Sequence, residues 1–484
     1  MKRFKRLYLL VGVLALVCVL TFAVSRHESR KEAIRASGEV VLELSPDSVQ
    51  TLSWDCEDTG FSFHREDGAW TYDDDAAFPV DQDKIASLLS YFEQMGAAFT
   101  IEDPEDLGMY GLDDPLCTID LTLDDDQAYT ITLGDFSTMD SQRYVSIGDG
   151  NVYLVQNDPL DAFDVELRDL IDQDDVPYLS QTQAVTFSGE QNYTVTYAED
   201  SPDAWNDEDL FFTTRDGETI PLDTYRVEDY LSAITSLDLT NYVTYTADDE
   251  MLAQLGLDDP QLVIEVDYVD EDDDSGQVLT FQLSVSRDPE ELAAAQADQD
   301  QQDQQAQDQG TGDTSETEEE EEEITAYARV GDSKILYQIT GEEYTALMAA
   351  AYDDLRHQEV LPVDFEEMTQ LDITLDGESY TITAQGDEDD RTYLLGEEEV
   401  DLEDVLYAME CLSADSFTDQ SPTGKEEIRF TLTSSRESVG TVEVALYRQD
   451  GSYCLAQVNG QSVSLIPRDQ VVDLTEAINA IVLG

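Results

Sequence analysis

The phrase GLDDP stands at residues 111–115 and again at residues 256–260 of this 484-residue chain. Each copy follows a short stretch that we expect to be helical, residues 104–110 or 249–255. Glycine ends helices readily because it accepts the left-handed backbone conformation, and proline holds the residue before it extended. The phrase therefore predicts a helix end followed by a strand, and the two strands are expected at residues 117–123 and 262–269.

The phrase belongs to a longer unit that is repeated three times along the chain. Each unit opens with alternating apolar and polar residues, which is the pattern of half-buried strands in antiparallel hairpins. Glycine-containing turns at residues 66–68 and 376–377 support two of these hairpins. The apolar positions are Phe61, Phe63, Trp70 and Tyr72 in the first unit; Val185, Phe187, Tyr193, Val195 and Tyr197 in the second; and Leu371, Ile373, Leu375, Tyr380 and Ile382 in the third.

A helix is expected after each opening hairpin. The sequences PVD at 79–81, PLD at 221–223 and VD at 400–401 introduce it, and the aspartate of each can cap the first turn. Apolar residues at helical spacing follow, so one face of each helix should be buried against the sheet. These residues are Ile85, Leu88, Leu89 and Phe92; Val227, Tyr230, Leu231 and Ile234; and Val405, Leu406, Met409 and Leu412.

Each unit closes with a second hairpin and a short helical segment. The hairpins are expected at 144–148 with 152–155, at 327–331 with 335–339, and at 453–456 with 463–466, and the segments at 160–170, 343–348 and 473–482. The third unit lacks the GLDDP phrase. The pattern predicts an α+β protein made of three tandem repeats of antiparallel β-hairpins packed on helices, preceded by one N-terminal transmembrane helix.

The N-terminus carries the signals of a membrane anchor. Lys2, Arg3, Lys5 and Arg6 precede an uncharged, mostly apolar stretch at 7–24. Eighteen helical residues reach about 27 Å, which is enough to cross a hydrocarbon core. Basic residues favour the cytoplasmic side, so we expect a single-pass cell-membrane protein whose bulk is extracytoplasmic. Cleavage of this segment as a secretory signal stays open as the alternative.

These patterns divide the chain into six parts, one of which carries an insertion. Residues 288–323 are rich in Gln, Asp, Ala and Glu, and such a segment cannot bury enough apolar surface to order itself. The expected boundaries are 1–6 for a cytoplasmic basic tail, 7–24 for the transmembrane helix, 25–44 for a linker, 45–178 for repeat unit one, 179–360 for repeat unit two with a disordered insertion at 288–323, and 361–484 for repeat unit three.

Charge and cysteine content narrow the function classes. The chain has 110 acidic and 24 basic residues, a formal charge of -86, which disfavours nucleic acid as a partner. Weak association of divalent cations with this surface is expected instead. Past the anchor stand Cys56, Cys117, Cys411 and Cys454, whose spacing shows no metal-binding pattern. Pairing of Cys56 with Cys117 and of Cys411 with Cys454 stays open.

No residue is predicted to be catalytic, to bind a cofactor or to ligate a metal. We expect His64 and His357 to lie on the surface, and two such residues cannot build a common zinc site. A loop beginning at Asp270 resembles a calcium-binding loop but has Ser275 where glycine is needed and Phe281 where glutamate is needed. We interpret three other acidic stretches as solvated turns: residues 73–75, residues 124–126 and the aspartates of GLDDP. Aromatic residues on the strands, Trp54, Trp70, Tyr72 and Trp205 among them, read as core rather than as a sugar-binding surface.

The chain resembles a family of membrane-anchored bacterial proteins called domain of unknown function 4340. The resemblance covers residues 45–170 best and rests on the basic N-terminus with one span, PVD at 79–81, GLDDP at 111–115, ITLGD at 131–135, and the strand residues 144–145 and 152–155. It implies a gene neighbourhood of gliding-motility-type ABC transporters, with a permease and an extracytoplasmic companion protein as partners. It carries over no catalytic or binding residue.

These observations favour a non-enzymatic, membrane-anchored accessory or scaffold protein of an ABC-type transport complex. A second hypothesis is a cell-envelope module that binds wall polymer or divalent cations, and a third is an envelope hydrolase that uses paired carboxylates. With 110 acidic residues in the chain, paired carboxylates alone do not single out any site.

Overall fold

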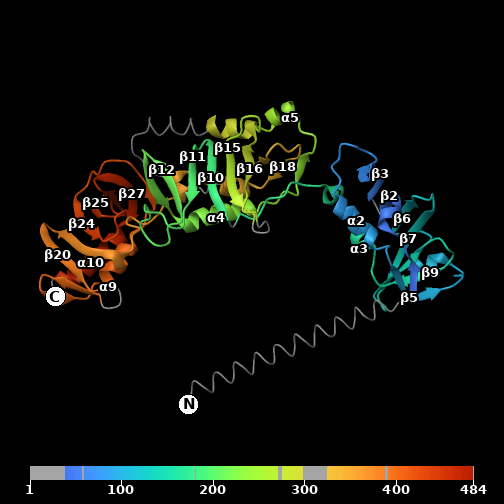
Figure 1. Cartoon of the computed structure of the whole chain (residues 1–484), viewed down its shortest axis with the longest axis horizontal. Coiled ribbons are helices and arrows are strands. Elements are labelled where there is room, and N and C mark those ends of the chain that lie inside the picture. Colours follow the sequence, from blue (N-terminus) through green and yellow to red (C-terminus); the bar gives the residue numbers. More distant parts are fainter. Residues whose placement is uncertain are drawn as a thin grey trace, which may run out of the picture. The chain divides into compact units, whose positions relative to one another are not determined.

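A computed structural model of the chain describes residues 39–56, 59–179, 181–270, 275–297, 324–386 and 391–482. The described residues form two compact units. The first contains the residues up to Asp174 together with Thr240–Thr246, and the second contains Asp175–Leu239 and the residues from Ala247 onward. Figure 1 shows the sheets and helices of both units along the chain.

Antiparallel sheets dominate both units. The described residues form three such sheets, each of nine strands. A run of seven strands has the same order in each: β4-β3-β2-β6-β7-β8-β9, β12-β11-β10-β15-β16-β17-β18 and β21-β20-β19-β24-β25-β26-β27. In every case the strand that opens the repeat (β2, β10 or β19) pairs with a strand that follows the helix (β6, β15 or β24), so a three-stranded and a four-stranded meander join side by side. The repeated order agrees with the three-unit pattern of the sequence.

The first unit holds the first sheet. Its strands are β1 Glu39–Leu42, β2 Val49–Cys56, β3 Thr59–Glu66, β4 Ala69–Tyr72, β5 Met95–Ile101, β6 Cys117–Leu123, β7 Ala128–Ser137, β8 Gln142–Ser146 and β9 Val152–Val155. Its helices are η1 Pro46–Ser48, α2 Gln82–Ser90, η2 Leu107–Tyr110, α3 Leu160–Phe163 and η3 Leu167–Leu170. The later segment, Thr240–Thr246, contains β14 Tyr242–Thr244, which is not a strand of this sheet. Strand β1 lies within the stretch expected to be a linker and pairs with β5.

The second unit holds the other two sheets. The first of these has β10 Thr182–Gly189, β11 Tyr193–Tyr197, β12 Phe211–Arg215, β13 Glu218–Leu222, β15 Leu262–Val269, β16 Val278–Arg287, β17 Ala326–Val330 and β18 Leu336–Ile339, with helices α4 Thr224–Thr235, α5 Asp249–Gln254, α7 Gly341–Met348 and α8 Tyr352–Leu355. The other has η4 Phe365–Glu367, β19 Met368–Leu375, β20 Glu378–Gln385, β21 Thr392–Leu395, β22 Glu398–Val400, α9 Glu403–Glu410, β23 Ser416–Phe417, β24 Glu426–Ser434, β25 Thr441–Arg448, β26 Tyr453–Val458, β27 Gln461–Pro467 and α10 Arg468–Val482.

The helices bury their apolar faces on the sheets, as the spacing predicts. In the second unit, Val227 and Ile234 of α4 join Val185 and Phe187 of β10 in one core. The closing helix packs beside the opening one: Tyr230 of α4 donates its hydroxyl hydrogen to the carbonyl oxygen of Leu347 in α7 at 2.8 Å. Helices α9 and α10 contact one another in the same way.

The turns follow the residue types that the sequence offers. At Asp67-Gly68 and Asp376-Gly377 both residues have positive φ, which suits the right-handed twist of two-residue hairpins. Gly111 and Gly256 end their helices in the left-handed conformation, with φ of 68° and 73°, so the predicted function of GLDDP as a helix end is confirmed. The strands β6 and β15 follow it as expected.

The helix caps agree with prediction in two units and differ in the third. The Asp81 carboxylate accepts hydrogen bonds from two backbone N–H groups of α2, and Asp223 does the same for α4. In the third unit Leu402 occupies the cap position of α9, but the Asp401 carboxylate still accepts the predicted hydrogen bond from a first-turn N–H, that of Glu403, at 3.1 Å. The helix therefore begins one residue later than the sequence suggests.

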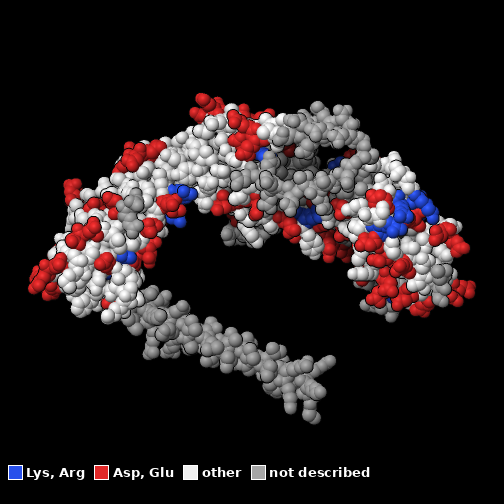
Figure 2. Space-filling model, turned by 180° about the vertical axis from the view of Figure 1, so that it is seen from behind, with Lys and Arg blue, Asp and Glu red and all other residues white. Residues whose placement is uncertain are grey.

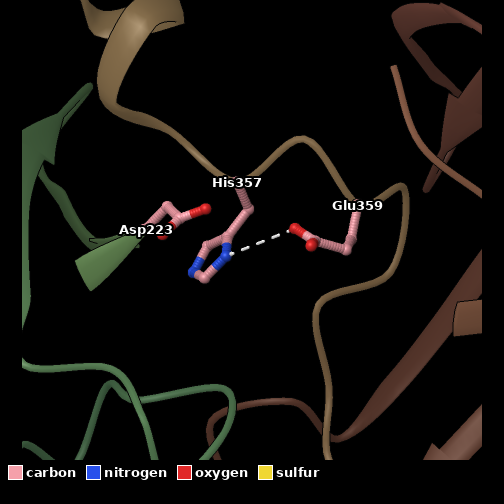
Figure 3. Close-up of side chains that lie close together, drawn as sticks. All are labelled: Asp223, His357 and Glu359. Carbon is pink, nitrogen blue, oxygen red and sulfur yellow. Dashed lines mark ion pairs between the residues drawn. The ribbon is translucent and has the colours of Figure 1, made fainter. Parts of the chain in front are cut away.

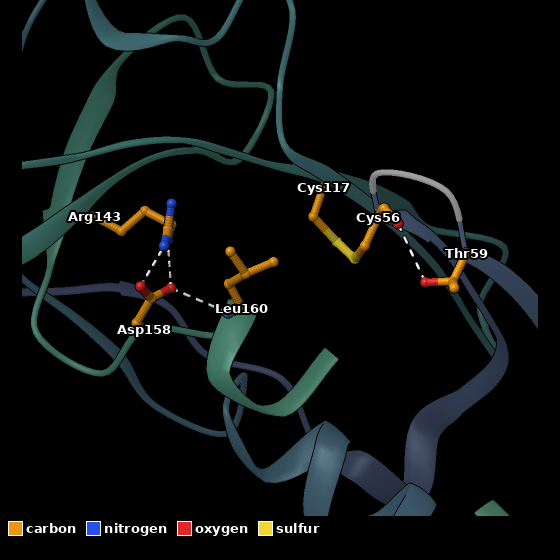
Figure 4. The surroundings of a disulfide bond; sticks show 6 residues. All are labelled: Cys56, Thr59, Cys117, Arg143, Asp158 and Leu160. Atoms are coloured by element: carbon orange, nitrogen blue, oxygen red, sulfur yellow. Dashed lines mark hydrogen bonds and ion pairs between the residues drawn. A yellow bond between two sulfur atoms is a disulfide. The ribbon is translucent and has the colours of Figure 1, made fainter. Parts of the chain in front are cut away.

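One of the two disulfides that the sequence leaves open is present among the described residues. Cys56 and Cys117 lie opposite each other on β2 and β6 and are bonded (Figure 4). Cys411 is free and exposed at the end of α9, whereas Cys454 is free and buried in β26. Cys411 and Cys454 are therefore not paired, because the helix end and the strand place the two thiols in different environments.

Two further predictions concern stretches that the structure describes only in part. Residues 289–297, inside the expected disordered insertion, are helical, and Asp288 accepts hydrogen bonds from the N–H groups of Glu290 and Glu291 at the start of this helix. Residues 298–323 lie outside the described residues, as does the predicted span at 7–24. Among the described residues no helix has the length and apolarity to cross a membrane.

Candidate functional site

The second unit contains a cleft of about 810 Å³ beside its two sheets. Strands and loops of both sheets line it, with Trp205 and Pro221 from one side and Val439 and Val463 from the other. The connection between the two sheets, which includes His357, passes along it. Another cleft of about 570 Å³, lined by Tyr178, Phe211 and Leu231 among others, brings only one acidic residue, Glu228, to its wall. The larger cleft is therefore the richer in reactive groups.

His357 stands at the centre of the polar group in the larger cleft. Its side chain is only 12% exposed, so the expectation of a surface histidine is wrong. Backbone hydrogen bonds hold the connecting segment on both sides: Asp223 N–H donates to the carbonyl of Leu355, and Ala414 N–H donates to the carbonyl of Gln358. The imidazole is thus fixed between the two sheets rather than free in solvent.

Asp209 binds one edge of the imidazole. Its Oδ1 lies 2.9 Å from His357 Nε2, and its side chain is 1% exposed. Its other oxygen, Oδ2, accepts hydrogen bonds from the backbone N–H groups of Trp205 and Asn206 at 2.7 and 3.1 Å. Because a carboxylate held in this way only accepts hydrogen bonds, His357 must carry a hydrogen on Nε2.

Two more carboxylates approach the same ring, as Figure 3 shows. Glu359 Oε2 lies 3.7 Å from His357 Nδ1, and the Glu359 side chain is 45% exposed. Asp223, the cap of α4, comes from the neighbouring chain segment. One ligand atom from each of Asp223, His357 and Glu359 lies within 4.8 Å of the others. This donor set, one imidazole and two carboxylates, is one that divalent transition metals accept.

The loop that carries Asp209 also joins the two sheets. Asn206 donates its side-chain amide to the carbonyl oxygen of Pro362, and the Ser438 hydroxyl donates to the carbonyl oxygen of Ala204. Arg436 forms ion pairs with Asp207. These contacts hold the loop against the connecting segment at Pro362 and against Arg436 and Ser438 of the other sheet's loop. The centroid of the Trp205 ring lies 6.3 Å from that of the His357 ring, in a stacked arrangement.

The charge environment of His357 is strongly acidic. Burial lowers the pKa of this imidazole, but its hydrogen bonds to Asp209 and Glu359 outweigh that effect and raise the pKa to about 9. The hydrogen bond with His357 in turn lowers the pKa of Glu359. Without a bound cation the ring is therefore protonated at neutral pH, and the proton lies on the side of Nδ1.

The other residues that the sequence singled out lie elsewhere. His64, in the first unit, contacts Asp73 and is 43% exposed, in line with its predicted surface position. Asp75 accepts a hydrogen bond from Tyr245, and Asp126 lies in a turn with positive φ. Residues 271–274 of the calcium-like loop lie outside the described residues.

The aromatic residues divide into two groups. Trp54, Trp70 and Tyr72 are buried in the core of the first unit, as predicted. Trp205 is only partly buried and lines the cleft, so for this residue the prediction of a core position is wrong. Its place in a loop between β11 and β12, rather than on a strand, explains the difference.

Comparison with known proteins identifies the family. The model of the family described as "Domain of unknown function (DUF4340)" matches residues 70–250 and 213–430, so the two matches together cover residues 70–430. They begin in the equivalent strands β4 and β12. This chain belongs to that family. No match was found among curated proteins or among solved structures.

Proposed function

We propose that this member of the DUF4340 family is a membrane-anchored, extracytoplasmic and non-enzymatic accessory protein of an ABC-type transport complex. The observation that carries the extracytoplasmic part is the Cys56–Cys117 disulfide. Disulfides persist in oxidising compartments and are rare in the cytosol. The basic residues before the apolar stretch 7–24 give the same orientation independently.

The arrangement of the cleft supports a non-enzymatic role. A serine nucleophile needs a histidine base within hydrogen-bond reach. Ser438, which lines the cleft, instead donates its hydroxyl to the carbonyl oxygen of Ala204. The Nε2 hydrogen of His357 is directed at Asp209. Both groups are thus engaged in holding loops together.

The surface supports an interaction with proteins rather than with anionic polymers. Figure 2 shows acidic atoms scattered widely over the visible face, with basic atoms in small groups. A net charge of -86 repels nucleic acid and anionic lipid. We propose a transporter as the partner because the family resemblance implies a permease and an extracytoplasmic companion protein.

The test is crosslinking in intact cells followed by purification through an affinity tag at the C-terminus. The proposal expects a permease to be recovered with the full chain. A variant with Leu14→Arg and Leu16→Arg, which places charges in the apolar stretch, should lose it. Recovery of peptidoglycan alone, or of the same proteins with the charged variant, would contradict the proposal.

A second candidate function is binding of a wall polymer, and the exposed part of Trp205 in the cleft favours it. Aromatic rings at a cleft wall offer flat apolar faces to sugar rings. Calorimetry with soluble wall fragments should then detect heat with the natural chain and none with Trp205→Ala. Equal binding by both chains would show that the cleft at Trp205 is not the binding site for wall polymer.

A further inference from the structure

We propose that Asp223, His357 and Glu359 bind one divalent transition-metal ion, with zinc the best match, at the junction between the two sheets of the second unit. This inference is independent of the proposed transport role. It rests on three features of the site: the donor atoms, the residue that orients the imidazole, and the charge that surrounds it.

The donor atoms are close to the spacing that a metal ion requires. Zinc bonds to nitrogen and oxygen are about 2.0–2.2 Å long, so ligand atoms around one ion lie about 3–3.5 Å apart. His357 Nδ1 and Glu359 Oε2 are already 3.7 Å apart, and the three donor atoms lie within 4.8 Å of one another. Glu359 is 45% exposed, so its side chain can rotate to close the remaining gap.

Asp209 supplies the orienting group that metal-binding histidines commonly have. Such a histidine donates its second ring N–H to a carboxylate or carbonyl, which fixes the tautomer and strengthens the ligand. Here Nε2 donates to the buried Asp209, and this leaves Nδ1 on the side of Glu359. Trp205 and Asn206 hold Asp209 through their backbone N–H groups. The imidazole and Asp209 are therefore held in place before any ion binds.

The charge balance favours a cation. Three carboxylates, from Asp209, Asp223 and Glu359, surround one imidazole. Arg226 compensates part of this charge, with its Nε 3.8 Å from Asp223 Oδ2. A divalent ion bound between these groups would neutralise part of this charge.

The histidine distinguishes this site from its counterpart in the first unit. Asp81 N–H donates to the carbonyl of Leu170, as Asp223 N–H donates to that of Leu355. Counting two residues onward from these leucines gives Asp172 in the first unit and His357 in the second. The first unit thus has a carboxylate at the position of the imidazole, and we expect zinc to prefer the second.

A bound ion would fix the two sheets of the second unit against each other. Asp223 begins α4, which packs on the sheet of β10–β18. Glu359 is paired with Ser413, beyond α9, on the side of the other sheet. The ion would connect these two segments through His357. Zinc binding should therefore also protect the connecting segment at 355–363 from proteolysis.

The experiment is zinc titration calorimetry on the full chain in detergent, with millimolar Mg²⁺ present to occupy the diffuse carboxylates. One zinc ion per chain is expected. Glu359→Gln and Asp223→Asn should each weaken binding about ten-fold or more, and Asp209→Asn should weaken it about 10- to 100-fold. Asparagine at 223 can still cap α4, and Glu359 is exposed, so these variants should fold. His64→Gln, at the other described histidine, is the matched control and should bind as the natural chain does.

A second readout distinguishes this site from general acidity. His357→Gln, which removes the nitrogen ligand, should abolish the stoichiometric zinc binding that the natural chain shows. X-ray absorption of the zinc-loaded chain should show nitrogen and oxygen ligands and no sulfur. Absence of stoichiometric zinc in the natural chain would overturn the proposal. Unchanged affinity in both Glu359→Gln and Asp223→Asn would do so as well.

Discussion

Asp209 and His357 are hydrogen-bonded at 2.9 Å although 148 residues separate them in the sequence. The bond joins a loop between β11 and β12 to the segment that leads into the next sheet. Since the Asp209 side chain is 1% exposed, its charge depends on this imidazole and on two backbone N–H groups for compensation. The stability of the folded chain should therefore depend on the charge of His357, and so on pH.

Metal-free protein should lose stability as the pH rises toward 9. In the folded chain burial lowers the pKa of His357, but Asp209 and Glu359 outweigh it and raise the pKa from 6.5 to about 9. The charged ring, which also faces Asp223 and through it Arg226, stabilises the fold fully below pH 6.5. That contribution, about 3 kcal/mol, disappears as the pH passes through about 9. Urea unfolding at several pH values should show the decline, and His357→Gln should lack it; equal slopes in both chains would contradict the assignment.

Loss of the disulfide should destabilise the first unit. Cys56 and Cys117 close a loop with a sequence separation of 61 residues, and such a crosslink restricts the unfolded chain. Replacing both by serine should lower the free energy of unfolding by about 3 kcal/mol. Thermal unfolding with and without reductant measures the same effect. Cys411→Ser, at a free and exposed thiol, is the control, and a loss of equal size there would refute the prediction.

Gly134 should tolerate no side chain. A Cβ at this position would lie 2.1 Å from the carbonyl oxygen of Tyr110, because η2 crosses close over β7. Gly134→Ala should therefore cost about 3 kcal/mol of stability. At Gly96 a Cβ would meet nothing within 4 Å, so Gly96→Ala should change stability by less than about 1 kcal/mol. Chemical unfolding of the two variants side by side tests this, and similar losses would show that the close approach is not the cause.

Replacing the buried Arg143 should destabilise the fold far more than replacing the exposed Arg168. Its Nε contacts both oxygens of Asp158 at 2.6 and 2.7 Å, and its Nη1 donates to the carbonyl of Gly134. Arg143→Met leaves Asp158 buried without its partner, which should cost about 3–5 kcal/mol. Arg168→Met, in an ion pair with side chains 56% and 65% exposed, should cost at most about 1 kcal/mol. Thermal melts compare the two directly, and an equal effect would refute the difference.

Much of the fold could be predicted because its signals are local. The alternation of Leu371, Ile373 and Leu375 predicts a strand with one buried face, and all three are buried. Gly111 has the left-handed conformation that the GLDDP phrase calls for. The strand order could not be predicted in this way. The pairing of β2 with β6 depends on contacts across about 60 residues, the separation that Cys56–Cys117 spans.

The candidate site was missed because its signals are not local. His357 has Arg356 and Gln358 as neighbours, and such a polar context predicts exposure. Its partner Asp209 is one of 110 acidic residues, so no sequence pattern selects it. The one available signal is the internal repeat, which places His357 where the first unit has Asp172. A change from carboxylate to imidazole at an otherwise matching position points to a specialised role.

The first unit is not continuous in the sequence. The chain leaves it after Asp174, returns to it for Thr240–Thr246 and leaves again at Ala247. The returning segment brings Tyr245, whose hydroxyl donates to Asp75 at 2.6 Å and whose ring contacts Phe78. A gene fragment that stops at residue 174 would thus encode an incomplete first unit, because it lacks the segment that brings Tyr245 to Asp75 and Phe78. The boundary of the first repeat in the sequence is therefore not a place where the chain can be cut.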